Sequence, residues 1–205
     1  ALTVMAAYPL SRRDLVGRNF VMFFYSFTMF FGGGIIPLYL LVRSLGMVNT
    51  RWAMLIPNAM AVWNVILTRT YFQSSIPHEL LESSQIDGCS NSRFVWSIVL
   101  PLSKPIVAVI SLFYGVMHWN TFFHALIFLK DSDLYPLQIV LREILIQNQM
   151  DNTMMMDIEQ QQHREMLAAL LKYSLIIVAS VPVLLIYPFV QKYFVKGVMI
   201  GAIKG

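Results

Sequence analysis

The sequence predicts an all-α fold, a polytopic bundle of membrane-spanning helices in a single domain covering residues 1–205. Hydrophobic residues make up 57% of the chain and charged residues only 13%, whereas soluble domains carry roughly 25% charged residues. The mean hydropathy is +0.62. Four apolar stretches are each long enough to cross a bilayer, which needs about 20 residues of helix.

The four predicted spans are 20–41, 52–72, 106–129 and 166–190. We expect helices throughout, because lipid offers no other partner for the backbone polar groups. The first span contains three glycines, Gly32–Gly34, followed by Pro37. These residues favour either a helix break or close helix packing through small residues, and the sequence leaves both open.

The basic residues predict the orientation of the spans. If the spans alternate, nine of the 15 basic residues fall on one face, which the positive-inside rule makes cytoplasmic. These nine are Arg12, Arg13, Arg18, Arg69, Arg93, Lys104, Lys192, Lys196 and Lys204. The other face carries Arg43, Arg51, Lys130, Arg142, Arg164 and Lys172, with the acids Asp131, Asp133, Glu143, Asp151, Asp157, Glu159 and Glu165.

The predicted loops differ in character. Residues 130–165 form an acidic external loop whose segment from Leu137 has helical apolar spacing at Val140, Leu141, Ile144 and Leu145. We expect a helix lying on the membrane or on its own domain, or one reaching an external partner. The apolar run before Ser11 is too short for a span, and we expect it to be the end of one.

The polar segment 73–104 lies between two apolar stretches and is predicted to contain a short helix over 77–88. Ser75 suits the N-cap position, Pro77 the first turn, and Gly88 the position after the C-terminus. The eleven residues from Pro77 to Asp87 would measure about 16 Å as a helix, far too short to span a bilayer. We expect Leu80, Leu81 and Ser84 to share one face.

The same segment carries a spaced motif. Glu82-Ser83-Ser84 is followed by Gly88 and then by Ile98-Val99-Leu100-Pro101. This resembles the cytoplasmic E-A-A signature of ABC-importer permeases, with serines replacing both alanines. The stretches "AAYPLSRRDLVGRNF", "GGGIIPLYLLVRSLGMVNT", "WNTFFHALIFLKDSDLYPLQ" and "YFVKGVMIGAIKG" resemble maltose-type carbohydrate permeases, closest to the MalG/LplC-like branch, over essentially the whole chain.

The resemblance implies a type I ABC importer permease fold, MetI-like, whose first span and the start of the second are absent from this chain. The helix 77–88 would be the coupling helix, docking on a separate ATPase. The residues implied in ATPase coupling are Glu79, Glu82, Ser83, Ser84, Asp87, Gly88, Leu100 and Pro101.

The implied location is the bacterial cytoplasmic membrane. The implied partners are a second permease subunit (MalF/LplB-like), two ATPase copies, an extracytoplasmic sugar-binding protein that engages loop 130–165, membrane lipid and a carbohydrate; no nucleic acid is expected. The tail 191–205 would reach toward the ATPases. The chain lacks a GxxxxGK[ST] phosphate loop, so we expect no cofactor here and ATP with Mg²⁺ on the partner.

Polar residues within the predicted spans are candidates for the substrate path, because such groups usually face the bundle interior or water. The candidates are Tyr114, His118, Trp119, Asn120, His124 and Asn64. The alternative is that they join helices by hydrogen bonds, and we weigh it as the more frequent case for any single residue.

Other chemistries are disfavoured. His78 and Glu82 could in principle share a metal, but no third ligand is evident, and His118 and His124 point about 240° apart around a helix. No convergent nucleophile and acid–base set suggests a membrane enzyme. The main alternative to a carbohydrate importer is a permease of the same fold for an amino acid, phosphate or metal. The sugar itself is not determined, although the LplC-like branch suggests an oligosaccharide and leans toward one rich in uronic acids.

Overall fold

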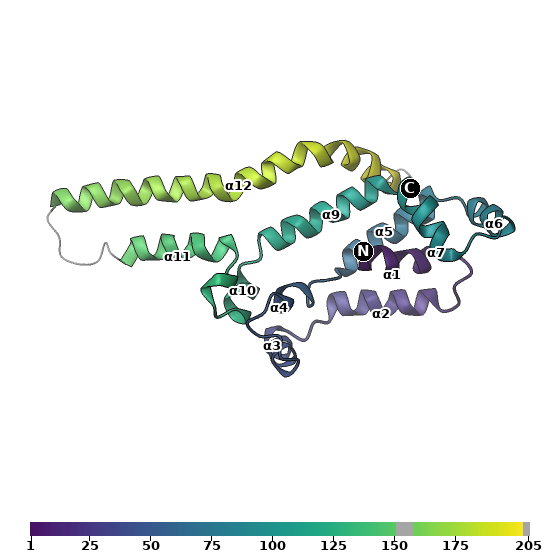
Figure 1. Ribbon diagram of the computed structural model, residues 1–205, viewed down its shortest axis with the longest axis horizontal. Coiled ribbons are helices and arrows are strands. Elements are labelled where there is room, and N and C mark those ends of the chain that lie inside the picture. Colours follow the sequence, from purple (N-terminus) through teal and green to yellow (C-terminus); the bar gives the residue numbers. More distant parts are fainter. Residues whose placement is uncertain (151–157, 203–205) are drawn as a thin grey trace. The chain divides into compact units, whose positions relative to one another are not determined.

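The computed structural model describes residues 1–150 and 158–202, and every described element is a helix or a connection (Figure 1). Predictions for residues 151–157 and 203–205, and for the side chains of 147–165, 168, 190 and 192–205, lie outside what is described. The all-α prediction is confirmed. The chain forms two compact units, Ala1–Leu38 with Leu55–Tyr114 and Phe189–Gly205, and Tyr39–Met54 with Gly115–Pro188.

The helices follow one another with short connections. They are α1 (Leu2–Ser11), α2 (Arg18–Phe30), α3 (Ile35–Ser44), α4 (Trp52–Leu55), α5 (Val62–Ser75), α6 (His78–Ile86), α7 (Asn91–Phe94), the π-helix η1 (Val95–Val99), α8 (Leu100–Leu102), α9 (Lys104–Trp119), α10 (Phe123–Phe128), the 3₁₀-helix η2 (Ser132–Leu134), α11 (Leu137–Met150) and α12 (Ile158–Ala202).

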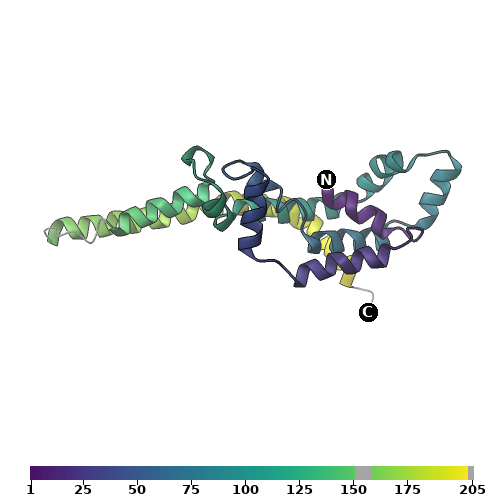
Figure 2. The ribbon, with the colours of Figure 1, turned by 90° about the horizontal axis from the view of Figure 1, so that it is seen from below.

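The first unit is built on α1 packed against α5, with α2 alongside; α6 and α7 project beyond the ends of α1 and α5 (Figures 1 and 2). The buried residues of its apolar core come from α1, α5, α6, α7, η1 and α9, and Met22 and Tyr25 of α2 pack against them. The Tyr8 ring lies 6.4 Å from Phe72 of α5 and 6.3 Å from Phe94 of α7. The projecting segment α6–α7 is thus anchored on α1 and α5.

The predicted span 20–41 is broken at its glycines. Helix α2 ends at Phe30, α3 begins at Ile35, and the pair is bent by 111°. Gly34 has φ +81°, and a Cβ at Gly32 or Gly34 would meet no atom within 4 Å. The structure therefore favours the helix break, because nothing in the described chain packs closely on these glycines.

The prediction of one continuous helix over 52–72 is wrong. Helices α4 and α5 are separated by residues 56–61. Pro57 explains the interruption, since it has no N–H to donate and disfavours the α conformation in the residue before it.

The helix predicted over 106–129 is also interrupted, between Trp119 and Phe123. Side chains supply hydrogen bonds at the break. The Asn120 side-chain amide donates to the Val116 carbonyl (2.9 Å), and the Thr121 hydroxyl donates to Met117 (2.8 Å). Carbonyls that end a helix are thereby satisfied without further turns.

The last predicted span, 166–190, lies inside the much longer α12, whose apolar window is Ala169–Phe189. By length and composition, α12 is the one described helix that could cross a membrane unbroken. Two bent helix pairs could each form one further crossing, which gives up to three in the described chain. One pair is α2 with α3, and the other is Asn91–Leu102 with Lys104–Trp119, which is bent by 84°.

The second unit contains the helix expected in the external loop. Helix α11 confirms that helix, and the apolar residues of its first turns divide between the core of the unit and the surface. Ile139 and Leu141 are buried, whereas Leu137 and Val140 are exposed. Ile139 packs with Ala125 and Leu129, so the start of α11 rests on its own unit.

Asn49 joins two connections of this unit. It has φ +62°, and its backbone N–H donates to the Phe128 carbonyl at 2.7 Å. Its side-chain oxygen accepts hydrogen bonds from the backbone N–H groups of Lys130 (2.8 Å) and Asp131 (3.0 Å). Its amide donates to the Asp131 carboxylate at 2.7 Å. One residue therefore holds the start of the acidic loop to the connection before α4.

Gly34→Ala should lower the free energy of unfolding by about 1–2 kcal/mol, because a Cβ is unfavourable at positive φ. Gly32→Ala is the matched control, since its site has the same open space without a positive φ. Chemical denaturation of both variants in detergent measures the difference. Equal stabilities would contradict the left-handed conformation at Gly34.

Candidate functional site

The N-cap of α6 lies two residues later in the chain than the sequence predicts. Ser75 was expected at the N-cap, but it is the last residue of α5, and Pro77 occupies the N-cap with no side-chain cap. Ile76 before the proline is extended (φ −114°, ψ 103°), as the steric demand of Pro77 requires. The first backbone N–H groups of α6 are consequently left without a side-chain acceptor.

Gly88 terminates α6 as the sequence predicts. Its φ is +72°, its N–H donates to the Gln85 carbonyl (3.0 Å), and the Cys89 N–H donates to Ser84 (2.9 Å). This pair of bonds is the Schellman arrangement, in which a left-handed residue closes the helix end. It turns the chain sharply toward α7.

The predicted coupling residues are divided between two faces of α6. Ser84 is only 6% exposed and Leu81 7%, and the Ser84 hydroxyl donates to the Leu81 carbonyl at 2.8 Å. The exposed residues are Glu79, Leu80, Glu82, Ser83, Gln85, Ile86, Asp87 and Gly88. Leu80 was expected to share a face with Leu81 and Ser84, but it is exposed while they are buried. The small volume of Ser84 serves packing within this chain.

Sequence reasoning missed the apolar part of the exposed face. Ile86 is 87% exposed, and Leu80 is 37% exposed beside the acids. An apolar residue inside a polar motif was the available signal. An isoleucine held this far out of the core on a polar segment is suited to burial by another molecule.

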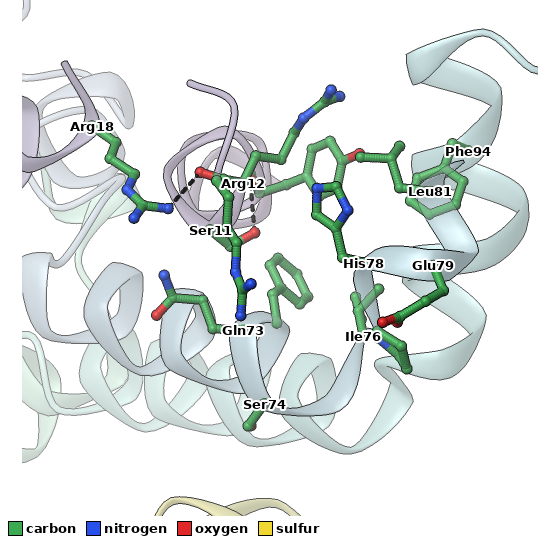
Figure 3. Close-up of a pocket in the computed structure, with 14 residues that line it drawn as sticks. Ser11, Arg12, Arg18, Gln73, Ser74, Ile76, His78, Glu79, Leu81 and Phe94 are labelled. Atoms are coloured by element: carbon green, nitrogen blue, oxygen red, sulfur yellow. Dashed lines mark hydrogen bonds between the residues drawn. The ribbon is translucent and has the colours of Figure 1, made fainter. Parts of the chain in front are cut away.

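A pocket of about 480 Å³ lies where α6 leaves the body of the first unit (Figure 3). Its residues come from the end of α1, the start of α2, the end of α5, and α6–α7. They are Tyr8, Ser11, Arg12, Arg13, Arg18, Phe72, Gln73, Ser74, Ile76, Pro77, His78, Glu79, Leu81 and Phe94. The pocket combines an apolar wall with three arginines.

Arg12 links the α1–α2 connection to α7. Its guanidinium donates to both Asp14 carboxylate oxygens (2.8 and 2.5 Å) and to the Asn91 side-chain oxygen (2.7 Å). These bonds lower the pKa of the Asp14 carboxyl below its usual value. The pair is therefore ionised at neutral pH, and its modest, solvent-exposed contribution is lost only as the pH falls through that lowered pKa.

His78 and Glu82 pair along α6, with the His78 Nδ1 3.0 Å from a Glu82 carboxylate oxygen. Both side chains are substantially exposed. The part of the chain that the structure describes holds no group of three or more His, Cys, Asp or Glu placed to bind a metal.

Leu100 and Pro101 follow the π-helix η1. A proline denies the preceding turn a hydrogen bond, and a wider i→i+5 turn adjusts to that loss. Leu100 is half-buried against the core, and Pro101 is exposed. Both lie beside the 84° bend into α9, where the chain turns from the polar segment to an apolar helix.

Two substrate-path candidates belong to the packing of the first unit. The Tyr114 hydroxyl accepts a hydrogen bond from the Ala61 N–H at 2.9 Å and lies 2.8 Å from the Thr3 hydroxyl. It thereby joins α9, the residue before α5, and α1. Asn64 is 5% exposed on α5. The structure supports the helix-joining alternative for Tyr114.

The other candidates lie in the second unit. The Trp119 indole N–H donates to the Ala179 carbonyl of α12 at 3.0 Å, again joining helices. The His124 ring stacks on Phe128 at 6.0 Å. Asn120 is exposed at the break after α9, and His118 is half-buried. A role in the substrate path stays a prediction for these residues.

The comparisons with known proteins all find components of transport systems. Residues 1–200 match the family model described as "Binding-protein-dependent transport system inner membrane component". The chain is 44% identical to Protein LplC of Bacillus subtilis (strain 168) over 207 residues, covering 99% of this chain and 68% of that protein. It is 45% identical to the polygalacturonan/rhamnogalacturonan transport system permease protein YtcP of the same organism, covering 100% of this chain and 70% of YtcP.

A solved structure is also similar. It is a bacterial ABC transporter involved in the import of the acidic polysaccharide alginate. The TM-score is 0.79 at 32% sequence identity, and the match covers 93% of this chain and 67% of that chain.

Tyr114→Phe should reduce stability by about 1–2 kcal/mol, because it removes two hydrogen bonds and leaves the Ala61 N–H without its partner. Tyr25→Phe is the matched control, since among the described residues that hydroxyl donates to a weak acceptor, the Met60 sulfur, at 3.9 Å. Thermal unfolding of both variants in the same detergent measures the effect. A Tyr114→Phe variant as stable as the control would contradict a joining role.

Proposed function

Because the chain belongs to the family of binding-protein-dependent transport system inner membrane components, we propose that it is the permease subunit of an ATP-driven importer that moves an acidic oligosaccharide into the cytoplasm. The observation that carries this proposal is the sequence identity of 44% to LplC and 45% to YtcP over essentially the whole chain. The chain is a transporter subunit rather than an enzyme.

The carbohydrate class rests on several relatives. AraQ and MelC are named for arabinooligosaccharides and for melibiose, raffinose and stachyose, at 30% and 32% identity. YtcP is named for polygalacturonan and rhamnogalacturonan, and the similar solved transporter is involved in the import of the acidic polysaccharide alginate. Polygalacturonan and alginate consist of uronic acids, rhamnogalacturonan contains them, and YtcP is the most identical of these four proteins. We therefore favour a uronate-rich oligosaccharide over a neutral one.

ATP hydrolysis would come from a partner, because this chain has no phosphate loop. The exposed face of α6 is suited to bind such a partner. It presents Ile86 as an apolar anchor among the carboxylates Glu79, Glu82 and Asp87. A cleft with an apolar floor and basic rim would complement it, since binding hot spots are apolar groups surrounded by polar contacts.

The opposite face of α6 supplies a mechanical link. Leu81 packs in the same core as Phe72 of α5 and Tyr8 of α1. Movement of a bound ATPase would therefore displace the ends of two apolar helices rather than a loose loop, because close-packed cores transmit strain. In this proposal α6 and the C-terminal tail are cytoplasmic, and the acidic connection after α10 meets the external sugar-binding protein.

Vesicles containing the full-length protein with its second permease subunit, ATPase and binding protein should take up oligogalacturonate in the presence of ATP. Arabino-oligosaccharide offered to the same vesicles is the neutral comparison. Vesicles carrying Glu82→Lys, whose charge reversal opposes docking, serve as the uncoupled control. Uptake of the neutral sugar alone would overturn the acidic substrate, and uptake of neither sugar would overturn the carbohydrate proposal.

Ile86→Ser should weaken ATPase binding roughly tenfold to a hundredfold, since burial of such a side chain contributes about 1.5–3 kcal/mol. Val16→Ser is the matched control, because Val16 is 96% exposed between α1 and α2, outside α6. Co-purification of the ATPase, titrated against subunit concentration, measures the affinity. Equal retention by both variants would exclude the exposed face of α6 as the docking surface.

A further inference from the structure

The pocket at the base of α6 has properties that ATPase docking does not use. Its three arginines, Arg12, Arg13 and Arg18, face a single lining carboxylate, that of Glu79. Within residues 1–150 and 158–202, the ion pairs are Arg12–Asp14 and His78–Glu82. Arg13 and Arg18 therefore lack a carboxylate partner in the described chain, although they lie close together in sequence.

The geometry of α2 and α6 separates the charges that line the pocket. Arg18 begins α2, and one of its guanidinium nitrogens donates to the Arg12 carbonyl at 3.0 Å, which holds it against the α1–α2 connection. The N-terminus of α6 has no side-chain cap, but its first turn carries the Glu79 carboxylate, which complements the positive end of the helix dipole. The positive charge available to an anion is therefore that of the arginines.

The remaining wall of the pocket is apolar. Tyr8, Phe72, Leu81 and Phe94 belong to the buried core of the first unit. The pocket also lies where α1 and α5 both end, which in a bilayer is the level of the headgroups. A soluble anion needs no such apolar wall, whereas a lipid presents a phosphate next to apolar carbon.

The charges are also arranged across the pocket. Figure 3 shows Arg18 on one side, Glu79 on the opposite side, and Gln73 and His78 between them. A phosphodiester whose headgroup carries a hydrogen-bond donor, a hydroxyl or a primary ammonium, fits this order, with its phosphate on the arginines and its donor toward Glu79. The quaternary ammonium of phosphatidylcholine has no such donor. The volume of about 480 Å³ is within the range of roughly 300–1,000 Å³ usual for small-molecule sites.

From these observations we infer that the pocket between α1, α2, α5 and α6 binds the phosphodiester headgroup of a cytoplasmic-leaflet lipid. Arginine binds phosphate through paired N–H donors, and basic pockets between the cytoplasmic ends of spans are suited to lipid headgroups. The site would brace α6 against the membrane during coupling. The inference rests on the membrane orientation proposed above.

The test uses the assembled full-length transporter in nanodiscs of phosphatidylcholine with or without phosphatidylglycerol. Native mass spectrometry after detergent release counts the phosphatidylglycerol molecules retained by the transporter. Repeating the measurement at increasing fractions of phosphatidylglycerol gives the apparent affinity. Arg13→Gln should weaken retention about fivefold, the effect expected of one basic residue near an anionic surface. Arg13→Gln combined with Arg18→Gln should weaken it further.

Arg93→Gln is the matched control, because Arg93 is exposed on the same polar segment but does not line the pocket. Arg13→Gln alone guards against misfolding, since Arg18 also holds a backbone carbonyl. Equal retention by Arg13→Gln and Arg93→Gln would overturn the inference. The inference would also be overturned if Arg13→Gln lost the ATPase on co-purification but retained as much phosphatidylglycerol as the wild type, because the pocket would then be a contact with the ATPase.

Inorganic phosphate added to phosphatidylcholine nanodiscs distinguishes the two sources of the same chemistry. If phosphate stabilises the wild-type complex but not Arg13→Gln, while phosphatidylglycerol does not, the phosphate-binding chemistry holds but the lipid source is wrong. The wild type could also take up sugar in vesicles of pure phosphatidylcholine and retain no phosphatidylglycerol in the mixed nanodiscs. That result would overturn the lipid site while leaving the proposed transport function intact.

Discussion

The anchoring of α6 depends on one apolar contact, the burial of Leu81 and Phe94 against Tyr8 and Phe72. Full burial of such side chains stabilises by about 1.5–3 kcal/mol each. It joins a nine-residue polar helix to α1 and α5, and it determines which side of α6 faces outward. The exposed acids, Ile86 and the arginine-lined pocket all owe their positions to this contact.

The apolar helices are interrupted more than their hydropathy indicates. Breaks occur at residues 31–34, at residues 56–61 around Pro57, and at Asn120, and at each of them the local chemistry explains the loss of helix. In membranes such backbone is tolerated where protein or water satisfies the freed groups. The Tyr114 hydroxyl does this for Ala61. The interrupted helices are thus held by specific polar contacts as well as by apolar packing.

The spaced motif from Glu82 to Pro101 was sufficient to predict the family, which the family match and the relatives LplC and YtcP confirm. It worked because glycine at a left-handed helix end and proline at a bend are required by the backbone itself. The roles of individual residues were harder to predict. Ser84 belongs to the motif but faces the core, while Ile86 belongs to the exposed face.

The sequence by itself determined the helical class, the apolar stretches and the end of α6 at Gly88, because composition, hydropathy and backbone stereochemistry are local properties. Only the tertiary structure decided that Tyr114 and Trp119 bond to other helices, and that Arg13 and Arg18 line one pocket with Glu79. These groupings bring together residues far apart in the chain. They arise from the packing of helices on one another within each unit, and local patterns carry no information about that packing.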